Sequence, residues 1–262
     1  DKTGPEISVE SEDKNWFNSG VKISANACDA VSGVNEESWR NRINTISGFS
    51  GTSSGNREIF IEDDGIFSIQ FMVSDKAGNE SKSIERTIRI DKCPPIIKTD
   101  ILSETNWISS NRVEAFAEDS LSGIDENSWE SFVDGIRYGN KKIVENLADG
   151  FHIVRFKVSD VAGNYSEKEF SIHVDKTSPF ISDFACLSKN GLIIPSIYDE
   201  TSGINAGKTM WSIDNQNWTL GSEVLLNEGV YDLAFYAEDM ACNSVSKKCP
   251  VTVDWTPPEI DF

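Results

Sequence analysis

The stretch Asp75-Lys-Ala-Gly-Asn79 decides the fold, because it occurs three times along the chain at nearly equal spacing. It returns as Asp160-Val-Ala-Gly-Asn164 and, in a weaker form, as Asp239-Met-Ala-Cys-Asn243. A short string that recurs at a fixed period is typical of a chain built from repeated structural units. The sequence therefore predicts three copies of one unit.

Two further strings recur in the same order around this one. An opening string, Asp-Lys-Thr-Gly-Pro in its first copy, starts at Asp1, Asp91, Asp175 and Asp254. An Asp-x-x-Ser-Gly string starts at Asp29, Asp119 and Asp199. These landmarks predict three tandem domains at residues 1–90, 91–174 and 175–253, followed at 254–262 by the start of the next linker.

Each copy carries apolar residues at every second position before the Asp-x-Ala-Gly-Asn string. The inward positions are Phe67, Ile69, Phe71 and Val73 in the first copy, His152, Val154, Phe156 and Val158 in the second, and Tyr231, Leu233, Phe235 and Ala237 in the third. A period of two with one apolar face indicates a half-buried strand. Asp134-Gly135 and Asp214-Asn215 are typical of tight hairpin turns.

The segments before Asp-x-x-Ser-Gly alternate in the same way. Their inward positions are Ile23, Ala25 and Ala27, then Val113, Ala115 and Ala117, then Ile193, Pro195 and Ile197. About seven short strands in roughly 80 residues predict an antiparallel β-sandwich. The fold class is therefore all-β, with three tandem antiparallel β-sandwiches expected in an extended head-to-tail array. Helix is expected only as single turns near residues 35–40 and 125–130.

The order of these strings resembles the bacterial immunoglobulin-like repeats of surface proteins, adhesins and large secreted enzymes. The resemblance covers the whole chain three times. It implies a spacer or binding scaffold in a longer extracellular protein. Three positions depart from the pattern: Cys93 and Trp255 in the linkers, and Cys242 in the third Ala-Gly-Asn string.

In a sandwich of this topology, the opening Asp and both Asp-bearing loops lie at one end of the domain. Asp91, Asp119 and Asp160 should therefore converge in the second repeat, and Asp175, Asp199 and Asp239 in the third. One interpretation is turn chemistry, in which the carboxylates accept hydrogen bonds from nearby amides. The other is a calcium ion at each junction, because calcium takes six to eight oxygen ligands.

The five cysteines form no Cys-x-x-Cys pair, which argues against a zinc cluster. Cys186 and Cys249 fall on the first and last strands of the third repeat, which are neighbours in many such sandwiches, so a disulfide between them is one expectation. Cys28 should face outward. Trp16, Trp107 and Trp255 are candidates either for a binding surface or for packing against a linker.

The bulk composition excludes several classes of function. The formal net charge of −19 argues against nucleic acid as a partner, and no apolar run is long enough to span a membrane. Only two histidines are present, and Gly51-Thr-Ser-Ser-Gly55, which matches a hydrolase motif, lies in a loop of one repeat only. The sequence therefore predicts a protein that is not an enzyme and has no cofactor other than the calcium considered above.

The function expected from the sequence is a non-catalytic spacer or stalk in a bacterial cell-surface or secreted protein. The alternative is an adhesive module that recognises a glycan or a host protein through loops or a sheet face. In both cases we expect an extracellular monomer, on the bacterial cell wall or secreted.

Overall fold

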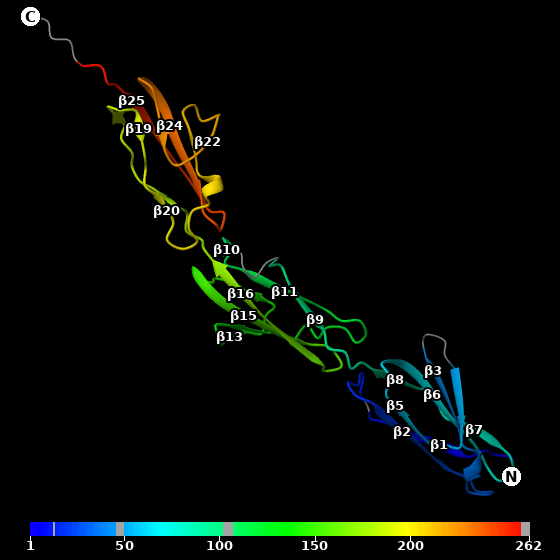
Figure 1. Cartoon of the computed structure of the whole chain (residues 1–262). Helices are drawn as coiled ribbons and strands as arrows, with labels where there is room; N and C mark the ends of the chain where they lie inside the picture. The colour runs from blue at the N-terminus through cyan, green and yellow to red at the C-terminus, as the bar shows by residue number, and fades with distance from the viewer. Residues whose placement is uncertain (13, 46–49, 102–106, 258–262) are drawn as a thin grey trace, which may run out of the picture. The chain divides into compact units, whose positions relative to one another are not determined.

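The computed structural model describes residues 1–12, 14–45, 50–101 and 107–257, and for residues 50–54 it describes the backbone alone. Strands dominate these residues, and each repeat has two facing layers of strands (Figure 1). Within the described part of the chain, no helix is long and apolar enough to cross a membrane.

The first repeat pairs its strands in two antiparallel sheets, with orders β1-β2-β5 and β4-β3-β6-β7, and β8 also pairs with β6. The single residue Phe17 bridges to Ile90 in parallel. An immunoglobulin sandwich has its first, second and fifth strands on one sheet and its third, sixth and seventh strands on the other. The first repeat has this arrangement. The strands are β1 Glu6–Glu10, β2 Val21–Cys28, β3 Arg40–Thr45, β4 Ser50–Ser54, β5 Glu58–Ile61, β6 Gly65–Ser74, β7 Glu80–Lys82 and β8 Arg86–Ile90.

The second repeat has the same arrangement, with sheet orders β14-β11-β9 and β10-β16-β15-β12-β13. Its short strand β10 runs parallel to the end of β16. The strands are β9 Ile96–Thr99, β10 Trp107–Ile108, β11 Val113–Glu118, β12 Glu130–Val133, β13 Ile136–Gly139, β14 Ile143–Val144, β15 Gly150–Ser159 and β16 Tyr165–Val174.

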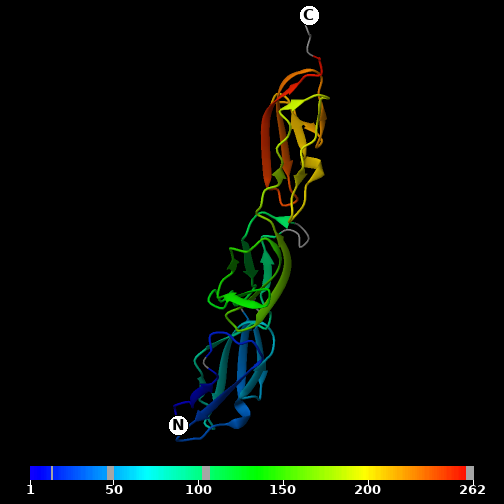
Figure 2. The same cartoon turned by 90° about the vertical axis from the view of Figure 1, so that its left-hand side faces the viewer.

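The third repeat interrupts its second strand at Pro195, so that β20 pairs with β17 and β19 with β23. The opposite sheet has the order β18-β25-β24-β21-β22, in which β24 and β25 are long neighbours (Figures 1 and 2). The strands are β17 Phe180–Ile181, β18 Leu187–Ser188, β19 Leu192–Ile193, β20 Ile197–Tyr198, β21 Met210–Ser212, β22 Thr219–Leu220, β23 Val224–Leu225, β24 Gly229–Glu238 and β25 Ser244–Val253.

The predicted alternation of buried and outward residues is confirmed in the long strands. Phe71, Phe156 and Phe235 occupy the same position of β6, β15 and β24, and all three are fully buried. Burying an aromatic side chain of this size removes its apolar surface from water, which is the dominant favourable term in folding. Each repeat therefore has its own apolar core between its two sheets.

One of the two predicted hairpin turns is confirmed and the other is not. Asp134-Gly135 forms a tight turn with both φ angles positive, as predicted. Asp214-Asn215 does not, because β21 and β22 pair Trp211 with Thr219, and the connection between them is longer than two residues. The Asp214 carboxylate accepts hydrogen bonds from the amides of Gln216 and Asn217, which holds this wider loop open.

Helical structure in the described residues is limited to two 3₁₀ turns, η1 Glu36–Ser38 and η2 Ala206–Lys208. The first turn was predicted. The turn near residues 125–130 is not helical, and η2 was not anticipated. Asn35 and Asn205 cap η1 and η2 by accepting a hydrogen bond from the amide two residues on.

Contacts divide the chain into two compact units. One contains Asp1–Lys98, Phe116–Glu130 and Lys157–Lys168, and the other contains Thr99–Ala115, Ser131–Phe156 and Glu169–Phe262. The first unit thus includes the Asp-bearing loops of the second repeat. The residue boundaries of the three predicted domains stay a prediction.

Candidate functional site at the repeat openings

Three acidic clusters form where each repeat begins. Each cluster brings together the opening Asp, the Asp of the loop after the second strand, and the Asp of the loop after the sixth. In every cluster one carboxylate oxygen from each of the three residues lies within 4.8 Å of the other two. The clusters are Asp91, Asp119 and Asp160; Asp175, Asp199 and Asp239; and Asp1, Asp29 and Asp75. The structure brings both predicted sets together and adds the first repeat, which carries the same strings.

The Asp-x-x-Ser-Gly loop folds around its own carboxylate. Asp119 accepts hydrogen bonds from the amides of Leu121 and Gly123, at 3.0 and 2.7 Å. Gly123 has a φ of 82°, which favours glycine because it has no Cβ. This loop therefore has the turn chemistry that the sequence predicted.

The Asp-x-Ala-Gly-Asn loop closes in a similar way. Asp160 is 2% exposed and accepts hydrogen bonds from the amides of Gly163 and Asn164, at 2.7 and 2.8 Å. The Asn164 side chain also donates to it at 2.8 Å. The amide of Val161 donates to the carbonyl of Gly123, so the two loops are bonded directly to each other.

Asp91 is hydrogen-bonded on two sides. Its amide donates to the carbonyl of Phe17 at 2.8 Å, before the linker. After the linker, its carboxylate accepts from the amide of Ser122 at 2.9 Å, and its carbonyl accepts from the Asn164 side chain at 2.8 Å. The same carboxylate accepts from the amide of Cys93, which fixes the linker itself.

Asp175 repeats this pattern at the next linker. Its amide donates to the carbonyl of Ile108 at 3.0 Å. Its carboxylate accepts from the amides of Thr177 and Ser202, at 2.9 and 3.1 Å, and its carbonyl accepts from the Asn243 side chain at 2.8 Å. Both Asp91 and Asp175 are fully buried.

The acidic residue before the sixth strand completes each linker contact. Asp149 accepts from the amide of Lys176 at 3.0 Å and from the hydroxyl of Thr177 at 2.9 Å. Asp64 accepts from the amide of Lys92 at 3.0 Å. This role of Asp64 and Asp149 was not identified from the sequence. We call the opening Asp (Asp91, Asp175), its acidic partner (Asp64, Asp149) and the loop Asn (Asn164, Asn243) the junction clamp.

The clamp is expected to weaken in acid. The Thr177 hydroxyl lowers the pKa of Asp149 most, burial opposes this, and the Lys176 amide and charge lower the pKa further. A folded pKa below the unfolded value of about 3.9 gives stability that is present above that pH and lost as the pH falls through the folded pKa. The protection of the Lys176 amide against hydrogen exchange, corrected for intrinsic rate, should therefore fall below about pH 4. Asp149→Asn should remove this dependence, and an unchanged dependence in that variant would refute the assignment.

The clusters also have the composition of a cation site. In the first repeat, the Ser32 hydroxyl lies 2.8 to 3.1 Å from one oxygen of each of Asp1, Asp29 and Asp75. A hydroxyl has one proton, so it donates to only one of these carboxylates at a time. Burial raises the pKa of Asp75, but hydrogen bonds from Asn79, Ser32 and Ala77 outweigh it and the pKa is lowered. Asp75 is therefore charged near neutral pH, and it lies close to the other two carboxylates.

The third repeat carries a strained residue where its sisters have glycine. Cys242 has a φ of 69°, at the position of Gly78 and Gly163. A residue other than glycine at such a positive φ costs the folded state roughly 1–2 kcal/mol. Glycine avoids this cost, but part of the gain is lost because glycine gives the unfolded chain more conformational entropy. Cys242→Gly should therefore raise the unfolding free energy of this repeat by about 0.5–1 kcal/mol, measured by hydrogen exchange in β24. The reciprocal Gly163→Cys should destabilise the second repeat; stabilisation there would contradict this reading.

The cysteines divide into one pair and three free thiols. Cys186 and Cys249 form a disulfide, with a Cα–Cα distance of 6.3 Å, the pair that the sequence suggested. Cys28, Cys93 and Cys242 are free and exposed. The hydrogen bond from Cys93 to Asp64, together with the Asp64 charge, raises the pKa of the Cys93 thiol, which keeps it protonated.

Trp107 and His152, two of the remaining sequence candidates, have structural contacts. Trp107 packs against His173, with ring centroids 4.9 Å apart, whereas Trp255 is 48% exposed. His152 contacts the Asp134 carboxylate and the Ala148 carbonyl. The Gly51–Gly55 motif runs along β4, which pairs with β3, and it is not a strand-to-helix turn; the side chains of residues 51–54 lie outside the described residues.

Comparison with known proteins gives similarity only at the level of structure. No family model matches the chain, and no curated protein matches it. Among solved structures, it is similar to fibronectin(III)-like modules of Clostridium thermocellum CbhA, with 14% identity over 64% of this chain and 94% of that chain and a TM-score of 0.31. Three N-terminal domains of the bacteriophage RB49 highly immunogenic outer capsid protein match with 10% identity, 95% and 99% coverage and a TM-score of 0.44.

A tetra-tandem repeat in the extending region of a large adhesion protein matches with 11% identity over 96% of this chain and 74% of that chain, at a TM-score of 0.33. At these scores the similarity carries no functional information. The class of protein follows from the strand order and the recurring loops: the chain is a tandem array of immunoglobulin-like β-sandwiches.

Proposed function

We propose that the chain is a non-catalytic extracellular spacer of a bacterial cell-surface or secreted multidomain protein. The observation that carries this proposal is the junction clamp, because the same hydrogen bonds recur at both internal linkers. A catalytic site normally occurs once, whereas the special residues of this chain occur in every repeat. Recurring contacts are expected in a spacer, because every linker between its repeats has to be restrained in the same way.

The clamp suits a spacer for an energetic reason. Fixing one backbone residue costs roughly 1–2 kcal/mol of conformational entropy, so a free linker stays mobile unless contacts compensate. At the second linker, the backbone of Asp175, Lys176 and Thr177 engages in hydrogen bonds through five groups. Such contacts on both sides of the opening Asp restrict the linker, which is the property that separates a spacer from a flexible tether.

Small-angle X-ray scattering tests the spacer directly. Three head-to-tail sandwiches, each with core strands of about ten residues spanning roughly 33 Å, predict a maximum dimension above about 100 Å. A glycan array and a host-protein pull-down with the same chain test the adhesive alternative. A compact scattering profile or reproducible ligand binding would overturn the pure spacer.

A bound cation is a second part of this proposal. We infer that calcium occupies the acidic clusters of the second and third repeats, supported by carboxylate oxygens that converge within 4.8 Å in each. Calcium favours oxygen ligands of this kind and would relieve the repulsion between the carboxylates. Binding to the folded state alone would stabilise it by about 2.7 kcal/mol at a hundredfold excess over Kd.

Calorimetric titration of the metal-free chain with calcium chloride separates the two parts. Asp119→Asn keeps an oxygen for the Leu121 and Gly123 amides but removes a charge, so it should weaken binding at one cluster without opening the loop. Asp63→Asn, at an exposed residue outside the clusters, is the matched control. Absence of heat and of any melting shift in millimolar calcium would overturn the cation and leave the spacer standing.

A further inference from the structure

The third repeat exposes an apolar sheet face. Along residues 192–198, which include β19 and β20, burial alternates: Ile193, Pro195 and Ile197 point inward, while the apolar Leu192, Ile194 and Tyr198 and the polar Ser196 point outward. Cross-strand neighbours extend the outward set, because Phe180 pairs with Tyr198 and Leu225 pairs with Leu192. We call these five outward residues the apolar face; their exposed fractions are Phe180 49%, Leu192 42%, Ile194 58%, Tyr198 46% and Leu225 74%.

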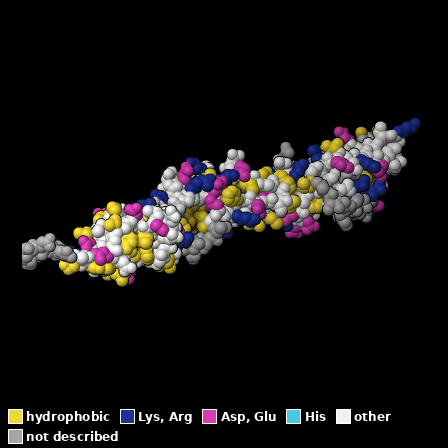
Figure 3. Space-filling model, turned by 90° about the horizontal axis from the view of Figure 1, so that it is seen from above, with side chains coloured by type: hydrophobic (Ala, Val, Ile, Leu, Met, Phe, Trp, Pro, Cys, Tyr) yellow, Lys and Arg dark blue, Asp and Glu magenta, His cyan; other side chains and the backbone are white. Residues whose placement is uncertain are grey.

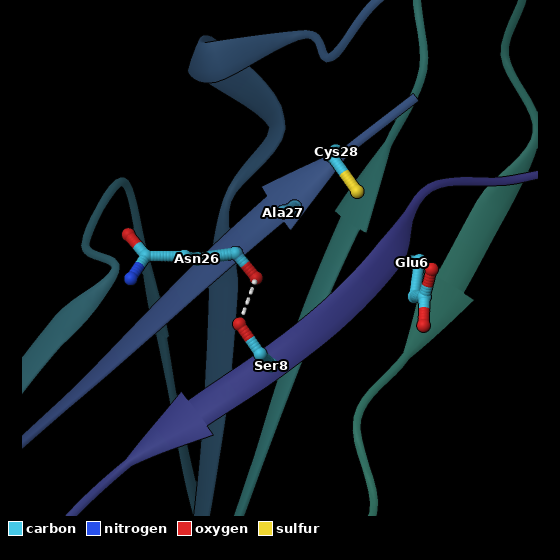
Figure 4. Close-up of a pocket in the computed structure, with 5 residues that line it drawn as sticks. All are labelled: Glu6, Ser8, Asn26, Ala27 and Cys28. Carbon is cyan, nitrogen blue, oxygen red and sulfur yellow. Dashed lines mark hydrogen bonds between the residues drawn. The ribbon is translucent and has the colours of Figure 1, made fainter. Parts of the chain in front are cut away.

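The fold does not require apolar residues at these positions. The matching strand of the first repeat, β2, presents Lys22, Ser24, Asn26 and Cys28 outward. That face carries a pocket of about 300 Å³ lined by Glu6, Ser8, Asn26, Ala27 and Cys28, in which the Ser8 hydroxyl donates to the carbonyl of Asn26 (Figure 4). In the second repeat, the matching strand alternates Glu114, Phe116 and Glu118. The third repeat therefore differs in this surface as well as in the interruption of its second strand at Pro195.

Hydrophobic side chains gather on the third repeat in the view of Figure 3. Half-exposed side chains of this size contribute roughly 90 Å² each, so the five residues expose roughly 450 Å² of apolar surface, within the range where the largest patch of a protein is often functional. A standard interface buries about 800 Å² on each partner, of which roughly 55–65% is apolar. The apolar face thus matches the apolar part of one standard protein interface.

The chemistry of the face favours a flat protein surface over a sugar. Three of its five residues are aliphatic and none is charged. The nearby Ser182 hydroxyl is already engaged, since it donates to the Asp183 carbonyl and accepts from the Ser196 amide. The hydroxyl groups of a glycan would find few partners here, and burying them without hydrogen bonds is costly.

The net charge of the chain affects how two copies can approach each other. The chain carries a net charge of −19, so two copies repel each other over most of their surface. None of the five residues of the apolar face is charged, so this repulsion is smallest where two copies meet face to face. Two sheets packed face to face, about 10 Å apart and related by a two-fold axis, would cover both faces at once.

We propose that two copies of this chain associate through the apolar face of the third repeat. This proposal departs from the monomer expected from the sequence, and it does not depend on the spacer function. Since the copies repel through their net charge, salt should strengthen the dimer by screening that repulsion. A contact held by opposite charges would weaken in salt instead.

Sedimentation of the full chain over a concentration series, in low and in high salt, tests this proposal. The wild-type chain should form a reversible dimer that tightens with salt. The outward double variant Ile194→Thr/Leu225→Thr should raise the dissociation constant at least about tenfold. Val230→Thr is the matched control, because Val230 is 75% exposed but lies on the opposite sheet, in β24.

Hydrogen exchange in β24 separates a loss of dimerisation from a loss of folding. Equal protection of the β24 amides in all variants shows that the third repeat stays folded. Three results would overturn the proposal: a wild-type chain that stays monomeric at the highest concentration, a double variant that dimerises as well as wild type, or a control that weakens the dimer equally. Capture of a glycan by the monomer alone would also overturn it.

Discussion

Replacing both Cys186 and Cys249 by alanine should lower the unfolding free energy of the third repeat by about 4 kcal/mol. The two residues are 63 positions apart, so the disulfide closes most of this repeat into one loop. In the chain-entropy account, the crosslink stabilises by restricting the unfolded chain, and a loop of this length corresponds to about 4 kcal/mol. Typical domains have only 5–15 kcal/mol in total, so the loss is large.

Hydrogen exchange at the most protected amides of β24, such as Leu233 and Phe235, measures this effect in the intact chain. Cys28→Ala is the control, because Cys28 is a free, exposed thiol of the first repeat. It should leave exchange in β24 unchanged. A loss below about 1 kcal/mol in the double variant would show that the crosslink is not a main source of stability, contrary to the loop-closure argument.

Asp160→Ala should destabilise the loop end of the second repeat by about 3 kcal/mol. The substitution removes the acceptor of three hydrogen bonds, from the amides of Gly163 and Asn164 and from the Asn164 side chain. Each buried donor left without a partner costs about 1–3 kcal/mol, partly recovered where water enters. The Val161 amide, which bonds the neighbouring loop, should lose protection against hydrogen exchange in parallel.

Two companion variants sharpen this experiment. Asp160→Asn keeps one acceptor oxygen but places an amide opposite the Asn164 amide, so it should give an intermediate loss. Asp63→Ala changes an exposed carboxylate and should have little effect, since surface substitutions are usually within about 0.5 kcal/mol. Equal losses for Asp160→Ala and Asp63→Ala would contradict the role of the buried hydrogen bonds.

The repeats and their core strands could be predicted from the sequence, because both leave a periodic signal. Apolar and polar residues alternate around Phe71 and its counterparts Phe156 and Phe235, and this alternation correctly predicted that these residues are buried. The meeting of Asp91, Asp119 and Asp160 followed from topology, since these loops return to one end of a sandwich. The prediction of a tight turn at Asp214-Asn215 was wrong, because the hydrogen bonds of the Asp214 side chain favour a wider loop.

The junction clamp could not be predicted, because its bonds join residues that are distant in sequence. Asp149 was visible as an acidic residue before a glycine, yet its partners Lys176 and Thr177 lie beyond a whole hairpin. The apolar face was also missed. Leu192 and Ile194 fit a strand pattern, but only the exposed fractions show that their side of the sheet is uncovered.

Amide hydrogen exchange at the linkers tests the central claim, that the recurring strings hold the linkers in place. The amides of Lys92 and Lys176 donate to Asp64 and Asp149, so both should be protected in the native chain. Asp149→Ala should release Lys176 while leaving Lys92 protected. Exchange of both amides at unfolded-chain rates in the wild-type protein would contradict the clamp and, with it, the spacer that it supports.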